Sequence, residues 1–226
     1  MKKGEKKKQH KMLKRRTTSN AERRAQRVSS AISPLHYVRQ ARSYPLEGCW
    51  IQKGWQEAGL AVIVIARRQP NGNIVFGNYL VDYYCLGLKN TYFNADIAPG
   101  EFRNSTLPRM FEHVGPLVEV SPALAHEIIY GAIEYADRYG FKPQRDYRDS
   151  QYILDLPGEH PRSGKVEFGK DGKPFYISGP HDNPDRIVQQ LMRTAGEGNF
   201  DYLMQVGGDE EVFLDDDFEV EEDDET

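Results

Sequence analysis

The chain has few cysteines and no long hydrophobic run, and both shortages limit the class of protein it can be. Its 226 residues include only Cys49 and Cys85, too few for a disulfide framework, and no Cys-x-x-Cys pair indicates a metal or redox site. This cysteine usage favours a reducing compartment. There is no apolar stretch of about 18 residues and no signal-peptide core of about 7 to 15 residues. We therefore expect a soluble, cytoplasmic protein.

Motifs that would fix a cofactor are also missing. The histidines show neither His-x-His nor His-Glu-x-x-His spacing, and the glycines between residues 158 and 172 match no dinucleotide-binding or phosphate-binding loop. The six histidines are His10, His36, His113, His126, His160 and His181. We therefore predict no metal site and no cofactor. The sequence favours a non-enzymatic protein but does not decide this point.

Charge is sorted to opposite ends of the chain, so the net charge of −4 hides two strongly charged segments. Residues 1–28 hold twelve Lys and Arg against two Glu, a net charge of +10, whereas residues 209–226 hold twelve acids and no base. The remaining middle carries a net charge of −2, which is ordinary for a globular domain. This distribution indicates a polyanionic partner for the amino-terminal segment.

The amino-terminal segment has the composition of a phosphate-binding arm. Each Lys or Arg that neutralises a phosphate releases a condensed counterion, which gives strong, salt-sensitive affinity without sequence preference. We predict binding to nucleic acid or a ribonucleoprotein. The candidate phosphate-binding residues are Lys6, Lys7, Lys8, Lys11, Lys14, Arg15, Arg16, Arg23, Arg24 and Arg27. The alternatives are a solvated tail and an anionic-membrane contact, for which the arm lacks an apolar face.

Four segments follow from composition and from helix-start signals. Residues 1–18 carry almost no apolar side chains and predict a disordered basic arm. Residues 19–45 predict a short helical, partly basic segment, and residues 46–207 predict the globular domain. Residues 208–226 interleave acids with spaced hydrophobic residues and predict a disordered acidic tail. This tail either binds a basic protein or masks the basic arm.

The globular domain is predicted to be α+β, mainly an antiparallel meander packed against a long helix. Residues 60–66 read LAVIVIA, apolar on both alternating sets, as in a strand covered on two faces. The Asn71-Gly72 pair predicts a tight hairpin with positive φ angles, after which strands continue through residues 74–84 and 88–93. Residues 122–140 predict the long helix, ending at Gly140.

The carboxyl-terminal part of the domain is predicted to add a hairpin, a helix and a strand. The Asp171-Gly172 pair predicts a second hairpin that joins residues 165–169 to residues 174–178. A helix over residues 184–195 and a last strand over residues 200–206 then complete the domain.

An enzymatic alternative depends on two carboxylates. Glu127 lies in the Ala-His-Glu-Ile run of the long helix, and the run Asp149-Ser150-Gln151-Tyr152 follows it. This order resembles the ribonuclease H-like family, in which a helix with a catalytic Glu precedes a strand with an Asp. The resemblance implies converging carboxylates on two divalent metals and nuclease activity. The family's first-strand Asp has no counterpart, since only Glu47 lies nearby. Helical spacing alternatively places Glu127 on a solvated face with Glu134.

Asp82 is the one acid lodged in a predicted strand. If it is buried, it needs a partner and its pKa is disturbed; the alternative is a strand-end acid satisfied by the backbone or an Arg. The strand aromatics stack bases if they stand on an open face, and otherwise pack across strands. They are Tyr79, Tyr83, Tyr84, Tyr92 and Phe93. A protein-interaction adaptor is the remaining alternative function.

Overall fold

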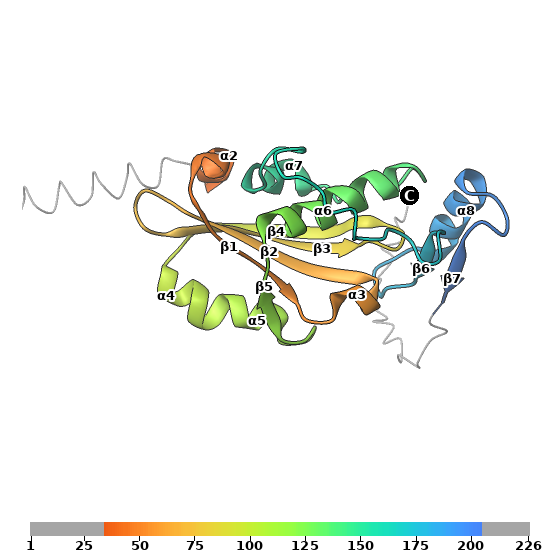
Figure 1. Ribbon diagram of the computed structural model, residues 1–226, viewed down its shortest axis with the longest axis horizontal. Helices are drawn as coiled ribbons and strands as arrows, with labels where there is room; N and C mark the ends of the chain where they lie inside the picture. Colours follow the sequence, from red (N-terminus) through yellow and green to blue (C-terminus); the bar gives the residue numbers. More distant parts are fainter. Residues whose placement is uncertain (1–33, 205–226) are drawn as a thin grey trace, which may run out of the picture.

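Five antiparallel strands form the centre of the domain (Figure 1). The computed structural model describes residues 34–204. Within them the strand order is β4-β3-β2-β1-β5. The strands are β1 (Leu46–Gln52), β2 (Leu60–Arg68), β3 (Ile74–Asp82), β4 (Gly87–Ile97) and β5 (Leu117–Glu119). Strands β1 to β4 are consecutive in sequence and confirm the predicted meander, and β5 joins the free edge of β1.

Strand β2 lies at the middle of the sheet and is buried on both faces, as its sequence predicts. Its two alternating sets of side chains enter two different hydrophobic clusters. One set comprises Ala61, Ile63 and Ile65, and the other comprises Val62, Val64 and Ala66. The two faces must therefore each be covered by other elements.

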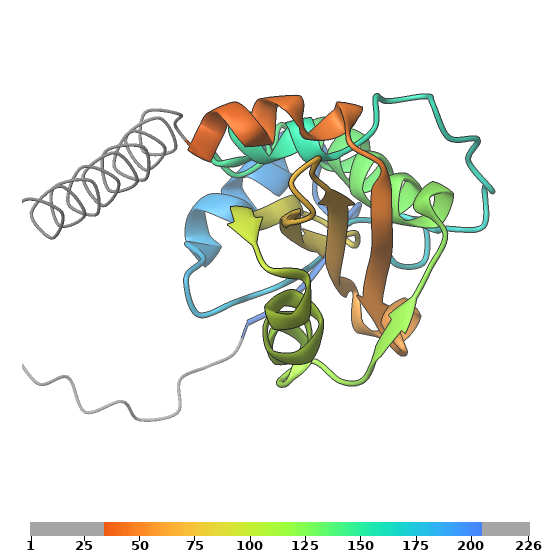
Figure 2. The same ribbon diagram turned by 90° about the vertical axis from the view of Figure 1, so that its left-hand side faces the viewer.

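One face is covered by α6 (Pro122–Asp137), together with α2 (Pro34–Gln40) and α7 (Tyr147–Ser150) (Figures 1 and 2). Helix α6 begins as predicted, with the Ser121 hydroxyl accepting a hydrogen bond from the Leu124 amide at 3.2 Å. It ends three residues before Gly140. The confirmed helix places its apolar side against the sheet.

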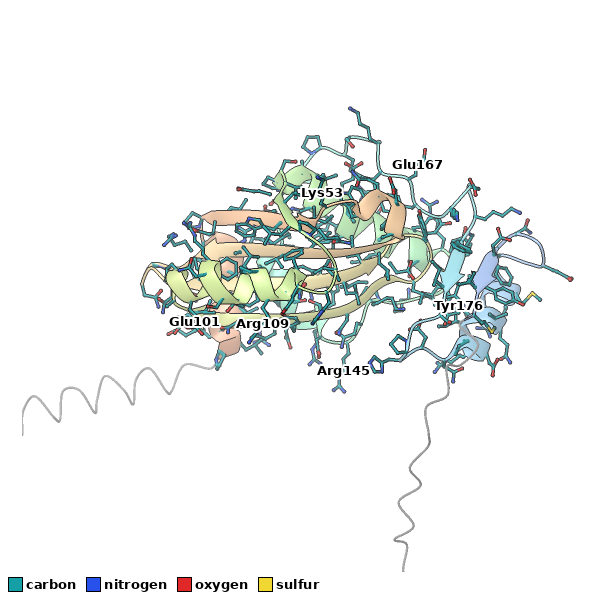
Figure 3. The ribbon with its side chains drawn as sticks, turned by 90° about the horizontal axis from the view of Figure 1, so that it is seen from below. Lys53, Glu101, Arg109, Arg145, Glu167 and Tyr176 are labelled. Atoms are coloured by element: carbon teal, nitrogen blue, oxygen red, sulfur yellow. The ribbon has the colours of Figure 1, made fainter. Side chains whose placement is uncertain are left out.

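The opposite face is covered by a helical segment that the sequence analysis did not assign (Figures 2 and 3). It consists of α4 (Pro99–Glu101), the π-helical turn η2 (Phe102–Thr106) and α5 (Leu107–Phe111). The Phe102 ring lies 5.8 Å from Trp50 and 5.2 Å from Phe76, between ring centroids. This contact anchors the segment under the sheet. A short helix, α3 (Trp55–Ala58), connects β1 to β2.

The hairpin turn between β2 and β3 differs from the predicted geometry. Only Gly72 has a positive φ, of 89°, whereas the prediction assigned positive angles to the Asn-Gly pair. The Gly72 amide donates to the Gln69 carbonyl at 2.9 Å, and the Asn71 side chain accepts from the Asn73 amide at 2.9 Å. The connection spans residues 69–73 and is longer than a two-residue hairpin turn. It needs only one left-handed residue, because the Asn71 side chain stabilises the rest of the turn.

The carboxyl-terminal elements form a small separate layer around Tyr176, and one prediction about them was wrong. Strand β6 (Phe175–Ile177) pairs in parallel with β7 (Asp201–Leu203), and α8 (Pro184–Thr194) packs beside them (Figure 1). The Asp171-Gly172 turn forms, with φ of 53° and 79°, but residues 165–169 form no strand.

The physical reason is that the chain before this turn is bound elsewhere. The Gly169 amide donates to the Tyr83 carbonyl at 2.9 Å, and Phe168 packs on α6 at Gly131. Residues 165–169 therefore bind to the main domain and do not pair with β6, which pairs with β7 instead.

Two remaining observations concern the cysteines and the bilayer. Cys49 and Cys85 are both buried as free thiols. Across residues 34–204, no helix combines the length and the apolar character needed to cross a membrane.

Several predictions concern residues outside the described range. They are the basic arm of residues 1–18, most of segment 19–45 and the acidic tail. All ten candidate phosphate-binding residues also lie outside it.

Candidate functional site

Glu127 has a structural partner that explains its position. Its side chain is buried, although helical spacing placed it on a solvated face. Its two carboxylate oxygens accept hydrogen bonds from the backbone amides of Ser163 and Gly164, both at 2.9 Å. Burial alone would raise the pKa of Glu127, but these amide hydrogen bonds hold it below its ordinary value. Glu127 fastens the loop that covers this side of α6.

Asp149 lies in a helix, whereas the ribonuclease H resemblance places it in a strand. The run from Asp149 to Tyr152 forms the end of α7 and the 3-10 turn η3 (Gln151–Ile153). Within this run Ser150 is fully buried, and its carbonyl accepts from the Tyr79 hydroxyl at 2.9 Å. The sequence run therefore anchors the turn to β3 through Ser150.

Asp82 is buried at the end of β3 and is satisfied by the backbone. Its Oδ1 accepts hydrogen bonds from the amides of Tyr84 at 3.1 Å and Cys85 at 2.9 Å. Burial raises its pKa to about 6, against the opposing effect of these amides. The geometry corresponds to the strand-end alternative, in which the acid shapes the turn into β4.

The three candidate carboxylates do not meet. In the described part of the chain, only one group of His, Cys, Asp and Glu side chains brings three possible ligand atoms within 4.8 Å of one another, and it contains none of them. The group consists of His126, Asp155 and His160. Glu127, Asp149 and Asp82 therefore give no two-metal centre among the described residues.

The cluster of His126, Asp155 and His160, called here the His–Asp cluster, joins α6 to the loop after η3. His160 Nε2 lies 2.8 Å from Asp155 Oδ2, and His126 Nε2 lies 3.8 Å from the same oxygen. The sequence search missed this group because 29 residues separate its first two members, and no spacing motif spans such a distance. Only the tertiary fold brings them together.

Hydrogen bonds fix how the members of the His–Asp cluster face each other. His126 Nδ1 lies 2.7 Å from the Pro122 carbonyl, and the Asp155 amide donates to His126 Nε2 at 2.9 Å. The Nδ1 atom therefore carries the proton. Burial lowers the pKa of His126, so the ring is neutral. Burial would raise the pKa of Asp155, but hydrogen bonds from His160 and Arg67 keep it below its ordinary value.

Arg67 supports the cluster from β2. Its side chain is buried and pairs with Asp155 Oδ1. It also donates to the carbonyls of Ile153 at 2.6 Å and Tyr44 at 3.0 Å. These bonds satisfy a buried guanidinium, which would be costly without partners. Arg67 thus ties the loop of the cluster to the sheet.

A second feature is a cationic groove of about 620 Å³ between α8 and the loop that follows α6, called here the α8 groove. Among the described residues that line it are three cations and no acid. Its charged and apolar lining residues include Lys142, Arg186, Arg193, Phe141 and Ile187. Lys142 pairs with Asp137 in an exposed ion pair, which is weak. Such a lining suits a phosphate or another anion.

The strand aromatics form no open stacking platform. Tyr79 is buried within β3, in agreement with the packing alternative. Tyr83 is also buried, but it follows β3 and packs edge-on against Trp55 of α3 at 5.6 Å between ring centroids. Tyr92 is 47% exposed, but its ring packs edge-on against Phe76 at 6.3 Å. Figure 3 shows this face of the sheet covered by the helical segment that carries Glu101 and Arg109. Base stacking on this sheet face therefore has little support.

Comparison with known proteins gives no assignment: no family model, no curated protein and no solved structure matches the chain. The fold and the two features above define an α+β domain with one His–Asp cluster and one cationic groove.

Proposed function

We propose that this protein is a non-catalytic, cytoplasmic accessory protein that binds nucleic acid or a ribonucleoprotein through its basic amino-terminal arm. The observation that carries the proposal is the sorting of charge in the sequence, with a net charge of +10 within residues 1–28. A segment of this density binds phosphate chains through counterion release. The acidic tail of residues 208–226 contacts a basic protein or competes with phosphate for the arm.

The folded domain adds support of a second kind. The α8 groove offers Arg186 and Arg193, together with Lys142 in its weak exposed pair with Asp137, and its described lining holds no acid. Contacts between such side chains and the phosphates of a nucleic acid position the protein without recognising the base sequence. We therefore expect the arm to supply most of the affinity and the groove to supply a smaller, orienting contribution.

The test is a binding measurement on the full chain with labelled single-stranded RNA, duplex RNA and duplex DNA. One variant replaces the ten candidate residues of the arm with glutamine, and a second carries Lys142→Gln, Arg186→Gln and Arg193→Gln. The full chain should lose affinity steeply between about 50 and 200 mM salt, since several phosphate contacts release counterions. The arm variant should lose most affinity at low salt and should flatten the salt dependence.

Two outcomes contradict the proposal. If the full chain binds none of the three nucleic acids and no ribosomal particle at low salt, phosphate recognition is excluded. If the arm variant binds as tightly as the full chain, the arm is not the binding element. Retained capture of a protein partner by the arm variant, without nucleic-acid association, indicates the adaptor alternative.

A further inference from the structure

The His–Asp cluster shares no residue with the basic arm or the α8 groove, and the proposed function leaves it unexplained. We propose that His126, Asp155 and His160 bind a divalent transition-metal ion of the zinc class. The ligand atoms are His126 Nε2, Asp155 Oδ2 and an imidazole nitrogen of His160. Two imidazoles and one carboxylate are a donor set that zinc accepts, with a fourth position left to water.

The distances place the donors near a metal geometry. Ligands at about 2.0 to 2.2 Å from a tetrahedral ion lie about 3.3 Å from each other. The separation of Asp155 Oδ2 from His160 is 2.8 Å and from His126 is 3.8 Å, so these pairs bracket that value. The two imidazoles must approach each other, and His160 can move because its side chain is 26% exposed.

Outer hydrogen bonds already orient two of the three donors. His126 holds its proton on Nδ1 against the Pro122 carbonyl, at 2.7 Å, which makes Nε2 the acceptor nitrogen, now bound to the Asp155 backbone amide at 2.9 Å. Asp155 uses Oδ1 for Arg67 and turns Oδ2 toward the histidines. Carbonyl and hydrogen-bonded carboxylate partners of this kind fix metal ligands in the correct orientation.

Metal binding replaces two existing hydrogen bonds of the cluster with coordination bonds. His126 Nε2 gives up the Asp155 amide, now at 2.9 Å, and Asp155 Oδ2 gives up His160. The positive charge of Arg67 on the other carboxylate oxygen offsets part of the attraction for a cation. We therefore expect a reversible site that is weaker than closed four-ligand structural zinc sites.

Metal binding at this place has a structural consequence. One ligand lies on α6 and two lie in the loop that follows η3, at positions 155 and 160. An ion bound by both elements stabilises the folded state, because the unfolded chain does not hold the three donors together. The thermal unfolding temperature of the protein should therefore rise with free zinc concentration.

The test uses the chelator-treated full chain and ZnCl₂ as the probe, with isothermal titration calorimetry and thermal unfolding as readouts. We expect one ion per chain at the tightest site and a rise in unfolding temperature that EDTA reverses. His160→Ala should weaken this binding at least about tenfold, since one of three protein ligands is removed. His113→Ala is the matched control, because that side chain is exposed and outside the cluster.

A second variant keeps the test decisive if one substitution disturbs folding. Asp155→Asn keeps the side-chain shape and the backbone amide, and it should also lose the tight binding while circular dichroism shows a folded protein. His10 and the acidic tail remain in every variant, so weak binding to them cannot mimic the difference. Absence of one-to-one zinc binding, or binding unchanged in both His160→Ala and Asp155→Asn, overturns the proposal.

Discussion

At the residue scale, two buried carboxylates show that the sign of a pKa shift depends on whether burial or the hydrogen-bond donors have the larger effect. Glu127 uses both oxygens on loop amides, and its pKa lies below its ordinary value in spite of burial. Asp82 is also held by amides, yet burial outweighs them and raises its pKa to about 6. The same chemical group therefore stabilises the fold at one position and opposes it, when ionised, at the other.

The raised pKa of Asp82 predicts a decline of stability with rising pH. The unfolded chain loses the Asp82 proton near 3.8 and the folded chain near 6, so the free energy of unfolding falls between these values. Asp82→Asn should remove this component, worth up to about 3 kcal/mol. Urea unfolding of both proteins at pH 4 and pH 7 measures it.

Asp182 provides a contrast for the Asp82 measurement. Burial would raise its pKa, but the hydrogen bond from Lys89, at 2.8 Å, keeps the pKa low. Its contribution to stability is therefore present above its unfolded pKa and is lost as pH falls through the folded value. If the free energy of unfolding varies with pH equally in Asp82→Asn and in the unmodified protein, the pKa of Asp82 is not raised in the folded state.

Glu127→Gln is expected to loosen the loop that contains Ser163 and Gly164. Glutamine keeps one accepting oxygen and turns an NH₂ group toward the other amide, so one hydrogen bond is lost in a buried place. The free energy of unfolding should fall by about 1 to 3 kcal/mol.

Glu134→Gln on the same helix is the matched control for Glu127→Gln. Glu134 is exposed and forms an ion pair with Arg162, which is typically worth about 0 to 1 kcal/mol. Hydrogen exchange of the Ser163 and Gly164 amides should accelerate much more in Glu127→Gln than in Glu134→Gln, because Glu134 contacts this loop only through the exposed side chain of Arg162. Equal acceleration in both variants would show that Glu127 is not the specific fastener of this loop.

At the scale of elements, periodicity predicted the parts of the fold with long, regular patterns. The double-sided burial of β2 and the apolar face of α6 follow directly from residues 60–66 and 122–137. Strand β5 has only three residues, too few to show alternation. The segment from α4 to α5 changes from α-helical to π-helical geometry and back within residues 99–111, so it shows no single helical period.

The candidate site was less predictable than the fold for a related reason. Glu127 and Asp149 were selected by linear spacing, but the amides that bind Glu127 come from 36 and 37 residues away. The His–Asp cluster likewise depends on a loop that crosses back to α6. Spacing motifs detect residues on one element, and neither of these arrangements is confined to one.

Packing of residues 161–169 on α6 predicts an unusual effect at Gly131. Alanine is normally better than glycine inside a helix by about 1 kcal/mol. A Cβ at Gly131 would lie 2.1 Å from the Phe168 ring, so the ring and its loop must move. We expect Gly131→Ala to lower the midpoint of thermal unfolding.

Gly100→Ala is the matched control for Gly131→Ala, because it is also helical and a Cβ there meets no atom within 4 Å. It should leave stability unchanged or raise it slightly. A stabilising effect of Gly131→Ala, equal to that of Gly100→Ala, would show that Phe168 is not fixed against α6.

At the scale of the whole molecule, the described domain is close to neutral and the charge lies in the terminal segments. The domain as a whole therefore does not attract a polyanion, and its one cationic feature described here is the α8 groove. The opposite signs of the two ends create competition, because an acidic segment and a phosphate chain attract the same Lys and Arg residues.

This competition gives the last prediction, which concerns the acidic tail. Removal of residues 209–226 eliminates twelve acids that attract the basic arm, so affinity for single-stranded RNA at low salt should increase several-fold. The gain should shrink toward physiological salt, where the Debye length is about 8 Å and contacts between exposed charges weaken. A variant with Asp and Glu of the tail changed to Asn and Gln keeps its length and should behave like the truncated chain. Unchanged RNA affinity in both proteins at low salt would show that the tail does not mask the arm and would leave a basic protein as its partner.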